Sequence, residues 1–146
     1  MKKKRGISLV EILVVLGILA LFLAVGVPRL SFIQKYKEEK KMEELAINTM
    51  KARRLALDSY QLVGVTFDSQ KYWVEREEEP IYESAYGGQL YLKGKACKVY
   101  FTRNGRPDYQ SAQSLYFQGK YHNYKLIIAP VTGQVRWEAE DEKRGI

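Results

Sequence analysis

The chain has 146 residues, a formal net charge of +7 and one cysteine, Cys97. Once an apolar N-terminal stretch is set aside, about 100 residues remain, which excludes more than one small domain. A single cysteine excludes an intramolecular disulfide, and His122, the only histidine, has no second His or Cys for a zinc site. We therefore expect Cys97 as a small buried apolar side chain and predict no metal or other cofactor.

The stretch Ile7–Pro28 is 22 residues long and almost wholly apolar. As a helix it would reach about 33 Å, close to the hydrocarbon core of about 30 Å. The basic cluster Lys2–Arg5 precedes it, which predicts a single pass through the cytoplasmic (inner) membrane, with the C-terminal domain outside the cytoplasm. Without the four basic side chains of this cluster the net charge falls to +3, so the remaining chain is only mildly basic.

Glu11 is the one charged residue in this stretch. A carboxylate inside a lipid-facing helix costs several kcal/mol unless a partner compensates it, so Glu11 is a functional candidate. No Lys, Arg or His lies between Ile12 and Pro28. The nearest cation is the amine that a cut before Ile7 would create, and on a neighbouring copy that amine could meet Glu11 in a bundle of helices.

This arrangement resembles the class III signal of type IV pilins and pseudopilins. The matching features are a short basic leader, Gly6 at the cut site, apolar Ile7 after it, Glu11 as fifth mature residue and Pro28 as twenty-second. The family most often has Phe in place of Ile7. The resemblance implies cleavage after Gly6 by a prepilin peptidase, N-methylation of Ile7, and assembly with other pilins or pseudopilins in a filament.

Two other interpretations of the stretch compete with this one. The first is an ordinary secretory signal peptide cut at Ala24-Val25-Gly26. Glu11 inside the apolar region and Pro28 just beyond that site argue against it. The second is a plain membrane anchor in which Glu11 has no role.

We expect the helix to continue past the membrane to about Tyr60, with a bend or melted turn at Gly26–Pro28, because proline removes a helical hydrogen bond. Gln34–Lys41 is charged all round and predicts a solvated neck. An apolar stripe then recurs at spacings of three and four, and predicts a face that packs on a sheet: Met42, Leu45, Thr49, Ala52 and Ala56. The opposite face carries Lys51, Arg53 and Arg54.

Short segments rich in β-branched and aromatic residues follow, separated by turn residues. They predict six or seven strands, at Leu62–Phe67, Tyr72–Arg76, Gln89–Leu92, Lys98–Thr102, Leu115–Phe117, Tyr121–Ala129 and Gln134–Glu138. Glu77–Pro80 is expected as an acidic loop. The fold class is thus α+β, with a long helix packed on a small, mostly antiparallel sheet. The predicted organisation is a leader at 1–6, a helix at 7–60 with 7–30 in the membrane, and a β-rich domain at 61–146.

The C-terminal segments extend the resemblance to the GspH/FimT-type minor pseudopilins of type II secretion and type IV pili. Val99–Pro107 contains a strand and an Asn-Gly-Arg turn, and Ile127–Arg136 contains a hairpin with Thr132-Gly133 before the last strand. Arg76–Lys98 is not covered. The resemblance implies a filament subunit whose partners are the prepilin peptidase, the inner-membrane assembly platform, membrane lipid and other pilins.

No catalytic motif is present in the sequence, and we predict that the protein is not an enzyme. Besides a minor pilin or pseudopilin, two functions stay open: a major pilin, and a DNA-binding minor pilin of a competence system. Some FimT-like proteins use Gly-Arg-x-Arg in the last hairpin for DNA uptake, but here Gln134 replaces the first Arg. The candidate DNA-binding residues, with Tyr116, Tyr121 and Tyr124 interleaved, are Arg103, Arg106, Lys120, Lys125 and Arg136.

Overall fold

The computed structural model describes residues 8–26, 29–109 and 114–140, and it divides the chain into two compact units, Met1–Gln34 and Lys35–Ile146. Helix α1 (Leu9–Gly26) belongs to the first unit. It begins directly after Ser8, whose carbonyl oxygen accepts hydrogen bonds from the amides of Glu11 and Ile12. Its sequence is built from Leu, Val, Ile and Ala, with Glu11 in the first turn, where a negative charge suits the helix dipole.

Helix α2 (Arg29–Ser59) follows. The next residue, Tyr60, has a backbone φ of 55°, which is incompatible with a further helical turn. The predicted apolar stripe is confirmed, because Met42, Leu45, Thr49, Ala52 and Ala56 are all buried. The hydroxyl of Thr49 donates to the carbonyl of Leu45, so this polar member of the stripe is satisfied inside the helix.

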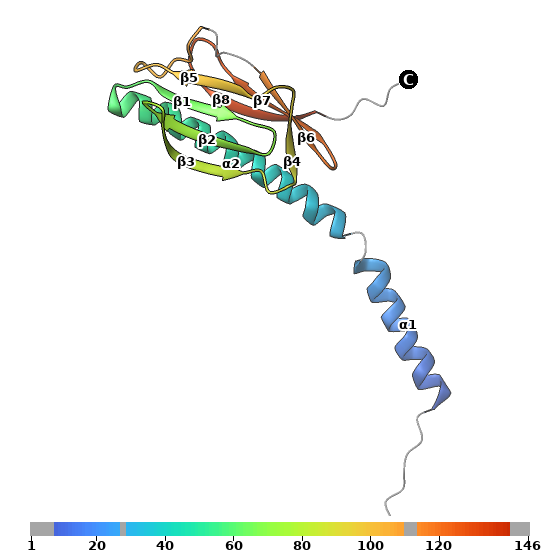
Figure 1. Ribbon diagram of the computed structural model, residues 1–146. Coiled ribbons are helices and arrows are strands. Elements are labelled where there is room, and N and C mark those ends of the chain that lie inside the picture. Colours follow the sequence, from blue (N-terminus) through green and yellow to red (C-terminus); the bar gives the residue numbers. More distant parts are fainter. Residues whose placement is uncertain (1–7, 27–28, 110–113, 141–146) are drawn as a thin grey trace, which may run out of the picture. The chain divides into compact units, whose positions relative to one another are not determined.

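In the described part of the chain, eight strands lie in two antiparallel four-stranded sheets (Figure 1). Sheet one has the order β3-β2-β1-β5, from β1 (Val63–Phe67), β2 (Lys71–Arg76), β3 (Glu79–Ala85) and β5 (Cys97–Phe101). Sheet two has the order β4-β6-β7-β8, from β4 (Leu90–Lys93), β6 (Ser114–Gly119), β7 (Asn123–Ile128) and β8 (Val135–Glu140). The predicted α+β class is confirmed, but the strands form two sheets where we expected one.

Strand β3 corrects the sequence prediction, which had an acidic loop at Glu77–Pro80 and no strand between Arg76 and Gln89. Glu77 and Glu78 form a tight turn at positive φ, and β3 starts directly after them. In the register between β2 and β3, Val74 faces Tyr82 and Glu75 faces Pro80, which leaves Ile81 as an extra residue in a bulge. The sequence of β3 resembles a loop because its residues are mostly charged or exposed, as an edge strand can be.

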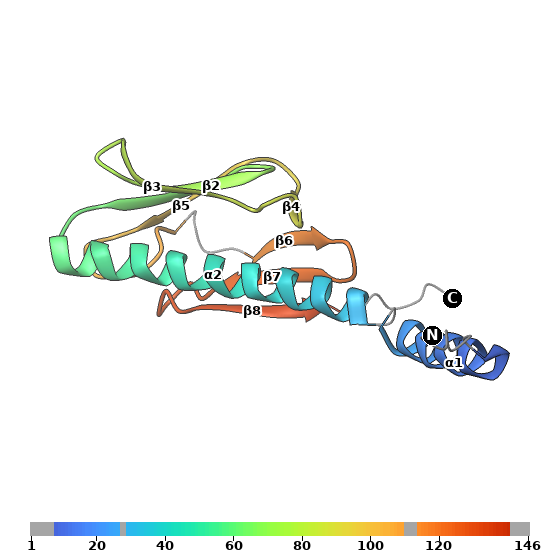
Figure 2. The same ribbon diagram turned by 90° about the horizontal axis from the view of Figure 1, so that it is seen from below.

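The core is shared by α2 and both sheets. Figure 2 shows α2 running lengthwise, with β2 and β3 on one side of it and β8 on the other. Aromatic rings join the sheets: Tyr72 of β2 stacks on Tyr86 at 5.8 Å between centroids, and Tyr86 meets the edge of Phe117 of β6 at 5.5 Å. All three rings are fully buried, so the two sheets form one hydrophobic core.

Candidate functional site

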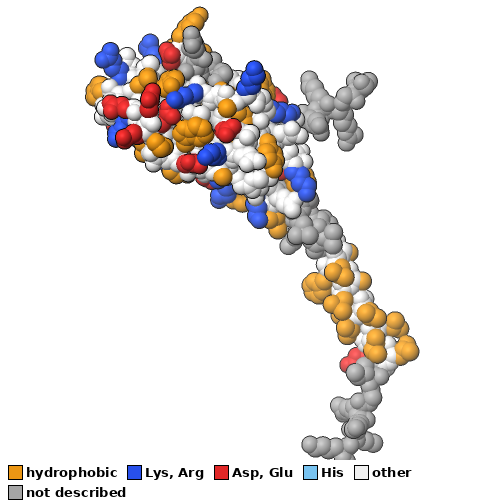
Figure 3. Space-filling view, in the orientation of Figure 1, with side chains coloured by type: hydrophobic (Ala, Val, Ile, Leu, Met, Phe, Trp, Pro, Cys, Tyr) orange, Lys and Arg blue, Asp and Glu red, His pale blue; other side chains and the backbone are white. Residues whose placement is uncertain are grey.

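The N-terminal unit presents apolar side chains around the whole of α1. Its large side chains from Leu9 to Leu23 are exposed, and Glu11 is the only charged residue of the helix (Figure 3). A helix that is apolar on every side needs an apolar environment or other helices around it. Within the part of the chain that the structure describes, no helix is long and apolar enough to cross a membrane.

The predicted cleavage and methylation residues, Gly6 and Ile7, lie outside the described residues. So does Pro28 of the predicted kink. Helix α1 ends at Gly26 and α2 begins at Arg29. The kink at Gly26 and Pro28 therefore stays a prediction, as does the assembly role of Glu11.

Glu38 lies in the segment that the sequence predicted as a solvated neck, but the structure buries it. Its side chain is 2% exposed. Its carboxylate accepts hydrogen bonds from the backbone amides of Lys120 at 2.9 Å and Tyr121 at 3.4 Å, and from the Tyr124 hydroxyl at 3.2 Å. Burial, followed by the nearby charge of Glu38, raises the pKa of Tyr124. Glu38 thus fixes the turn between β6 and β7 to the helix.

Two glycine turns of the C-terminal half meet at α2. The Arg53 guanidinium, expected on a solvent face, is half-buried and its Nε donates to the carbonyl of Gly105 at 2.8 Å. Gly105 has a φ of 67° and Gly133 one of 66°. A Cβ on Gly105 would press on Leu57, and one on Gly133 would collide with the Gly105 carbonyl and approach Arg53. The Asn-Gly-Arg and Thr-Gly turns therefore form one packed unit.

The five candidate DNA-binding residues come from different turns and strands of the C-terminal half. Arg103 and Arg106 lie on the turn after β5, Lys120 on the turn between β6 and β7, Lys125 on β7 and Arg136 on β8. Arg136 faces Ile127 at the end of β7 away from Lys120, and its Nε lies 3.6 Å from Glu138. Tyr124, expected to be interleaved with them, is fully buried. Lys125 lies opposite Glu138, two residues along the strand pair from Arg136. The role of the five residues in DNA binding stays a prediction.

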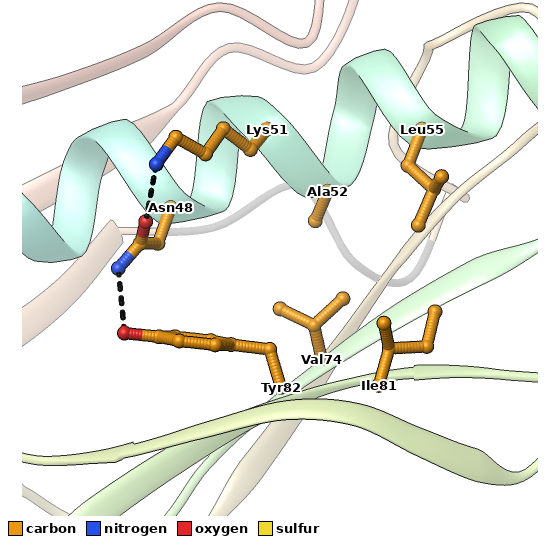
Figure 4. A pocket seen from close by; sticks show the side chains of 7 residues that line it. All are labelled: Asn48, Lys51, Ala52, Leu55, Val74, Ile81 and Tyr82. Atoms are coloured by element: carbon orange, nitrogen blue, oxygen red, sulfur yellow. Dashed lines mark hydrogen bonds between the residues drawn. The ribbon is translucent and has the colours of Figure 1, made fainter.

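A groove of about 300 Å³ lies between α2 and the bulged edge strand β3 (Figure 4). Val74 and Ile81 point from the sheet toward Ala52 and Leu55 of the helix, and Tyr82 points toward Asn48 (Figure 4). The bulge turns Ile81 toward the helix, because strict alternation would point neighbouring residues to opposite faces. At one end Asn48 donates to the hydroxyls of Tyr72 at 2.7 Å and Tyr82 at 3.4 Å, and accepts from Lys51.

Two residues with shifted pKa values belong to the core and not to a reactive centre. Burial raises the pKa of Tyr72 to about 12, although the hydrogen bond from Asn48 opposes this. Burial also raises the pKa of the Cys97 thiol, and the residue is half-buried against the core. Among the described residues, no group of three or more His, Cys, Asp or Glu could hold a metal ion.

Two comparisons with known proteins found a match. The prokaryotic N-terminal methylation motif matches residues 1–27. In fold, the chain is similar to the type IV minor pilin FimU of Pseudomonas aeruginosa strain PAO1. The chain has a type IV pilin-like fold and carries this methylation motif.

The similarity to FimU is one of fold, because 14% of the aligned residues are identical. It covers 75% of the pilin-like chain and 92% of FimU, with a TM-score of 0.59 for the crystal form P21. For the crystal form P65 the TM-score is 0.53, with 14% identity over 70% of the pilin-like chain and 92% of FimU. No curated protein matches the pilin-like chain in sequence.

Proposed function

We propose that the pilin-like chain is a minor subunit of a type IV pilus or of a type II secretion pseudopilus, which is cut after Gly6, methylated on Ile7 and built into a filament through its N-terminal helix. The observation that carries this proposal is the combination of a methylation motif at residues 1–27 with the fold of a minor pilin. Either feature alone would be weaker support, because the motif is short and the fold similarity has low identity.

The precursor waits in the inner membrane before assembly, with the domain outside the cytoplasm. Support comes from the exposed apolar surface of α1 and from the apolar residues on both sides of it in the sequence. The 18 residues of α1 rise about 27 Å, so Ile7, Ser8 and Val27 would complete a span of about 30 Å. The basic residues of the leader stay on the cytoplasmic side.

Assembly uses the amine that cleavage creates. In the filament, the amine of Ile7 on one subunit pairs with the Glu11 carboxylate of another, which removes the penalty of an unpaired charge among apolar helices. At an effective dielectric constant near 20, a pair at about 4 Å contributes roughly 4 kcal/mol before desolvation is subtracted. Glu11 is exposed in the subunit, as this pairing requires.

Processing is tested by the mass and N-terminal sequence of the mature protein, co-expressed with a prepilin peptidase. We expect a methylated chain that begins at Ile7. Gly6→Val should leave the precursor uncut, because a branched side chain replaces the small one before the cut bond. Mature protein that begins elsewhere, or cleavage of Gly6→Val at the wild-type position, would overturn the assigned site.

Assembly is tested with Glu11→Leu, measured as the fraction of the chain recovered in sheared filaments. We expect normal insertion and cleavage but at least a tenfold loss from filaments, since about 1.4 kcal/mol already corresponds to a factor of ten. Glu39→Leu, on the second unit, is the control and should incorporate normally. Wild-type incorporation of Glu11→Leu would refute the pairing while leaving the processing step intact.

A further inference from the structure

The turn after β5 contains Asn104 followed by Gly105, and an Asn-Gly pair is chemically labile. The backbone nitrogen of the glycine can attack the side-chain carbonyl carbon of the asparagine, because a glycine has no side chain to hinder the approach. A bond then forms between Gly105 N and Asn104 Cγ, and the side-chain NH2 leaves as ammonia with the proton of the Gly105 amide. Water opens the resulting cyclic imide at either carbonyl, which leaves Asp or isoaspartate at position 104. The reaction consumes only water.

The structure engages the nitrogen that would attack. Asn104 is exposed, but the amide of Gly105 donates to the carbonyl of Thr102 at 2.7 Å and closes the turn. The amide of Thr102 in turn donates to the carbonyl of Arg106 at 2.8 Å. The attack requires that the peptide group between Asn104 and Gly105 rotates toward the asparagine side chain, which breaks the hydrogen bond to Thr102. The closed turn is therefore unreactive.

Contact with α2 prevents this rotation. Gly105 is buried, and Arg53 Nε donates to its carbonyl at 2.8 Å. The position of the missing Cβ of Gly105 lies 2.9 Å from Leu57 Cγ, so this side of the residue is occupied. Gly133 packs against the Gly105 carbonyl from the other turn. Gly105 can change its conformation only when the turn leaves the helix.

We propose that Asn104 is a site of spontaneous deamidation, and that its rate is set by the undocking of this turn from α2, with Arg53 as the residue that holds the turn in place. The proposal concerns the chemistry of the folded domain and does not depend on filament assembly. Local opening of this kind is a general property of turns, and its frequency follows the contacts that must break.

The two products should affect the fold differently. Asp at position 104 keeps the length of the backbone and places a carboxylate between Arg103 and Arg106, where its charge is favourable. Isoaspartate inserts an additional atom into the backbone. The docked turn has no room for it, since Gly105 already contacts both Leu57 and Gly133. Formation of isoaspartate therefore keeps the turn off the helix.

The test follows the loss of the amide by mass spectrometry in the full chain, kept folded in a nonionic detergent and a mildly alkaline buffer. Chymotrypsin cuts after aromatic residues and releases the segment 102–109 for analysis. The reference is a synthetic peptide of the same residues, which has no helix to dock on. We expect the peptide to lose the amide at least about ten times faster than the folded chain, because the folded turn reacts only when it opens. In urea, the full chain should approach the rate of the peptide.

Variants test the role of Arg53. Arg53→Leu should accelerate amide loss about fivefold, the factor that corresponds to one ordinary hydrogen bond. Arg53→Met, which keeps more of the apolar side chain, should have the same effect. The control is Arg54→Leu, at the exposed residue next to it, which should react at the wild-type rate. Circular dichroism checks that each variant is folded.

Thermal unfolding distinguishes the products. The isolated isoaspartyl chain should unfold at a lower temperature than the wild type. Asn104→Asp, which has the new charge without the additional backbone atom, should unfold near the wild-type temperature.

Three results would overturn the proposal. If the peptide kept its amide, Asn104 would not be a modification site. Equal rates in the peptide and the folded chain would show that the fold does not protect it. A wild-type rate in folded Arg53→Leu and Arg53→Met would show that Arg53 does not hold the turn.

Discussion

The carboxylate of Glu38 joins two parts of the fold that are 82 residues apart in the chain. It satisfies two backbone amides of the turn between β6 and β7, and it accepts from the Tyr124 hydroxyl. A Cβ on Gly119 would lie 2.5 Å from the Glu38 carboxylate, so the turn needs glycine there to admit the side chain. The contact between the helix and the turn therefore requires both Glu38 and Gly119.

Removing this carboxylate should destabilise the domain strongly. Glu38→Ala leaves buried donors without an acceptor, and we expect a loss of about 2–4 kcal/mol in the free energy of unfolding. The control is Glu39→Ala, at the next residue, which removes an exposed pair with Lys35 at 3.9 Å. This variant should change the free energy of unfolding by less than about 0.5 kcal/mol. Urea denaturation followed by tryptophan fluorescence measures both. Equal stability of the two variants would contradict the role given to Glu38.

The sequence could not reveal Glu38. In Gln34–Lys41 it stands among charges of both signs, which is the pattern of a water-facing helix. Its partners are mainly backbone amides, which carry no sequence signal, and they lie on a distant turn. Glu11 differs from Glu38 in this respect, because its apolar neighbours in the sequence were enough to mark it as a functional candidate.

Among the elements, the two glycine turns depend on contact with α2 as well as on their own conformation. Asn104-Gly105 and Thr132-Gly133 were predicted as turns from local residue types, and the structure has turns at both. That they touch each other, with Arg53 bound to one of them, was not predictable, because the contact joins segments far apart in the chain. Strand β3 was missed for a related reason: its pairing with β2 decides its conformation more than its own composition.

Gly133→Ala should therefore lower the free energy of unfolding by more than backbone strain alone would. Gly87 has a similar φ of 71° but nothing lies within 4 Å of its missing Cβ, so Gly87→Ala measures backbone strain alone, about 1 kcal/mol. For Gly133→Ala we expect at least about 2 kcal/mol more, since its Cβ collides with the Gly105 carbonyl. Thermal denaturation of Gly87→Ala and Gly133→Ala measures the two losses of stability. Equal losses would show that the turns do not press on each other.

At the scale of the whole molecule, the buried tyrosines make the fold sensitive to alkali. Burial raises the pKa of Tyr72 to about 12, and it raises the pKa values of Tyr86 and Tyr124 as well. In the unfolded chain these groups ionise near pH 10. Stability from the neutral rings is complete below about pH 10 and is lost as the pH rises through about 12, because the unfolded state then binds fewer protons.

We expect the urea midpoint to be flat up to about pH 9 and to fall steadily between about pH 10 and 12. Tyr72→Phe removes one of the titrating groups, so its midpoint should fall less steeply, although the lost hydrogen bond from Asn48 lowers its stability at neutral pH. Identical slopes for the variant and the wild type would show that Tyr72 does not contribute to alkaline unfolding.

The order of elements and the α+β class could be read from the sequence, because a long apolar and amphipathic region precedes short strands. The division into two sheets could not. Nothing in the composition of Leu90–Lys93 distinguishes a strand that joins sheet two from one that would extend sheet one. That choice depends on Phe117, Tyr86 and other core residues that meet only after folding.

The exchange of β4 and β5 between the sheets has a consequence for how this domain can be made and altered. β4 pairs with β6, and β5 returns to pair with β1. During synthesis from the N-terminus, β1, β2 and β3 can pair as soon as they are made. Strand β4 stays without a hydrogen-bonded neighbour until β6 has been synthesised. Because β4 and β5 belong to different sheets, neither sheet is formed by one continuous segment that genetic recombination could transfer. A chain cut short after Lys93 would retain an open strand edge, and so would be a target for proteolysis or aggregation rather than a smaller working protein.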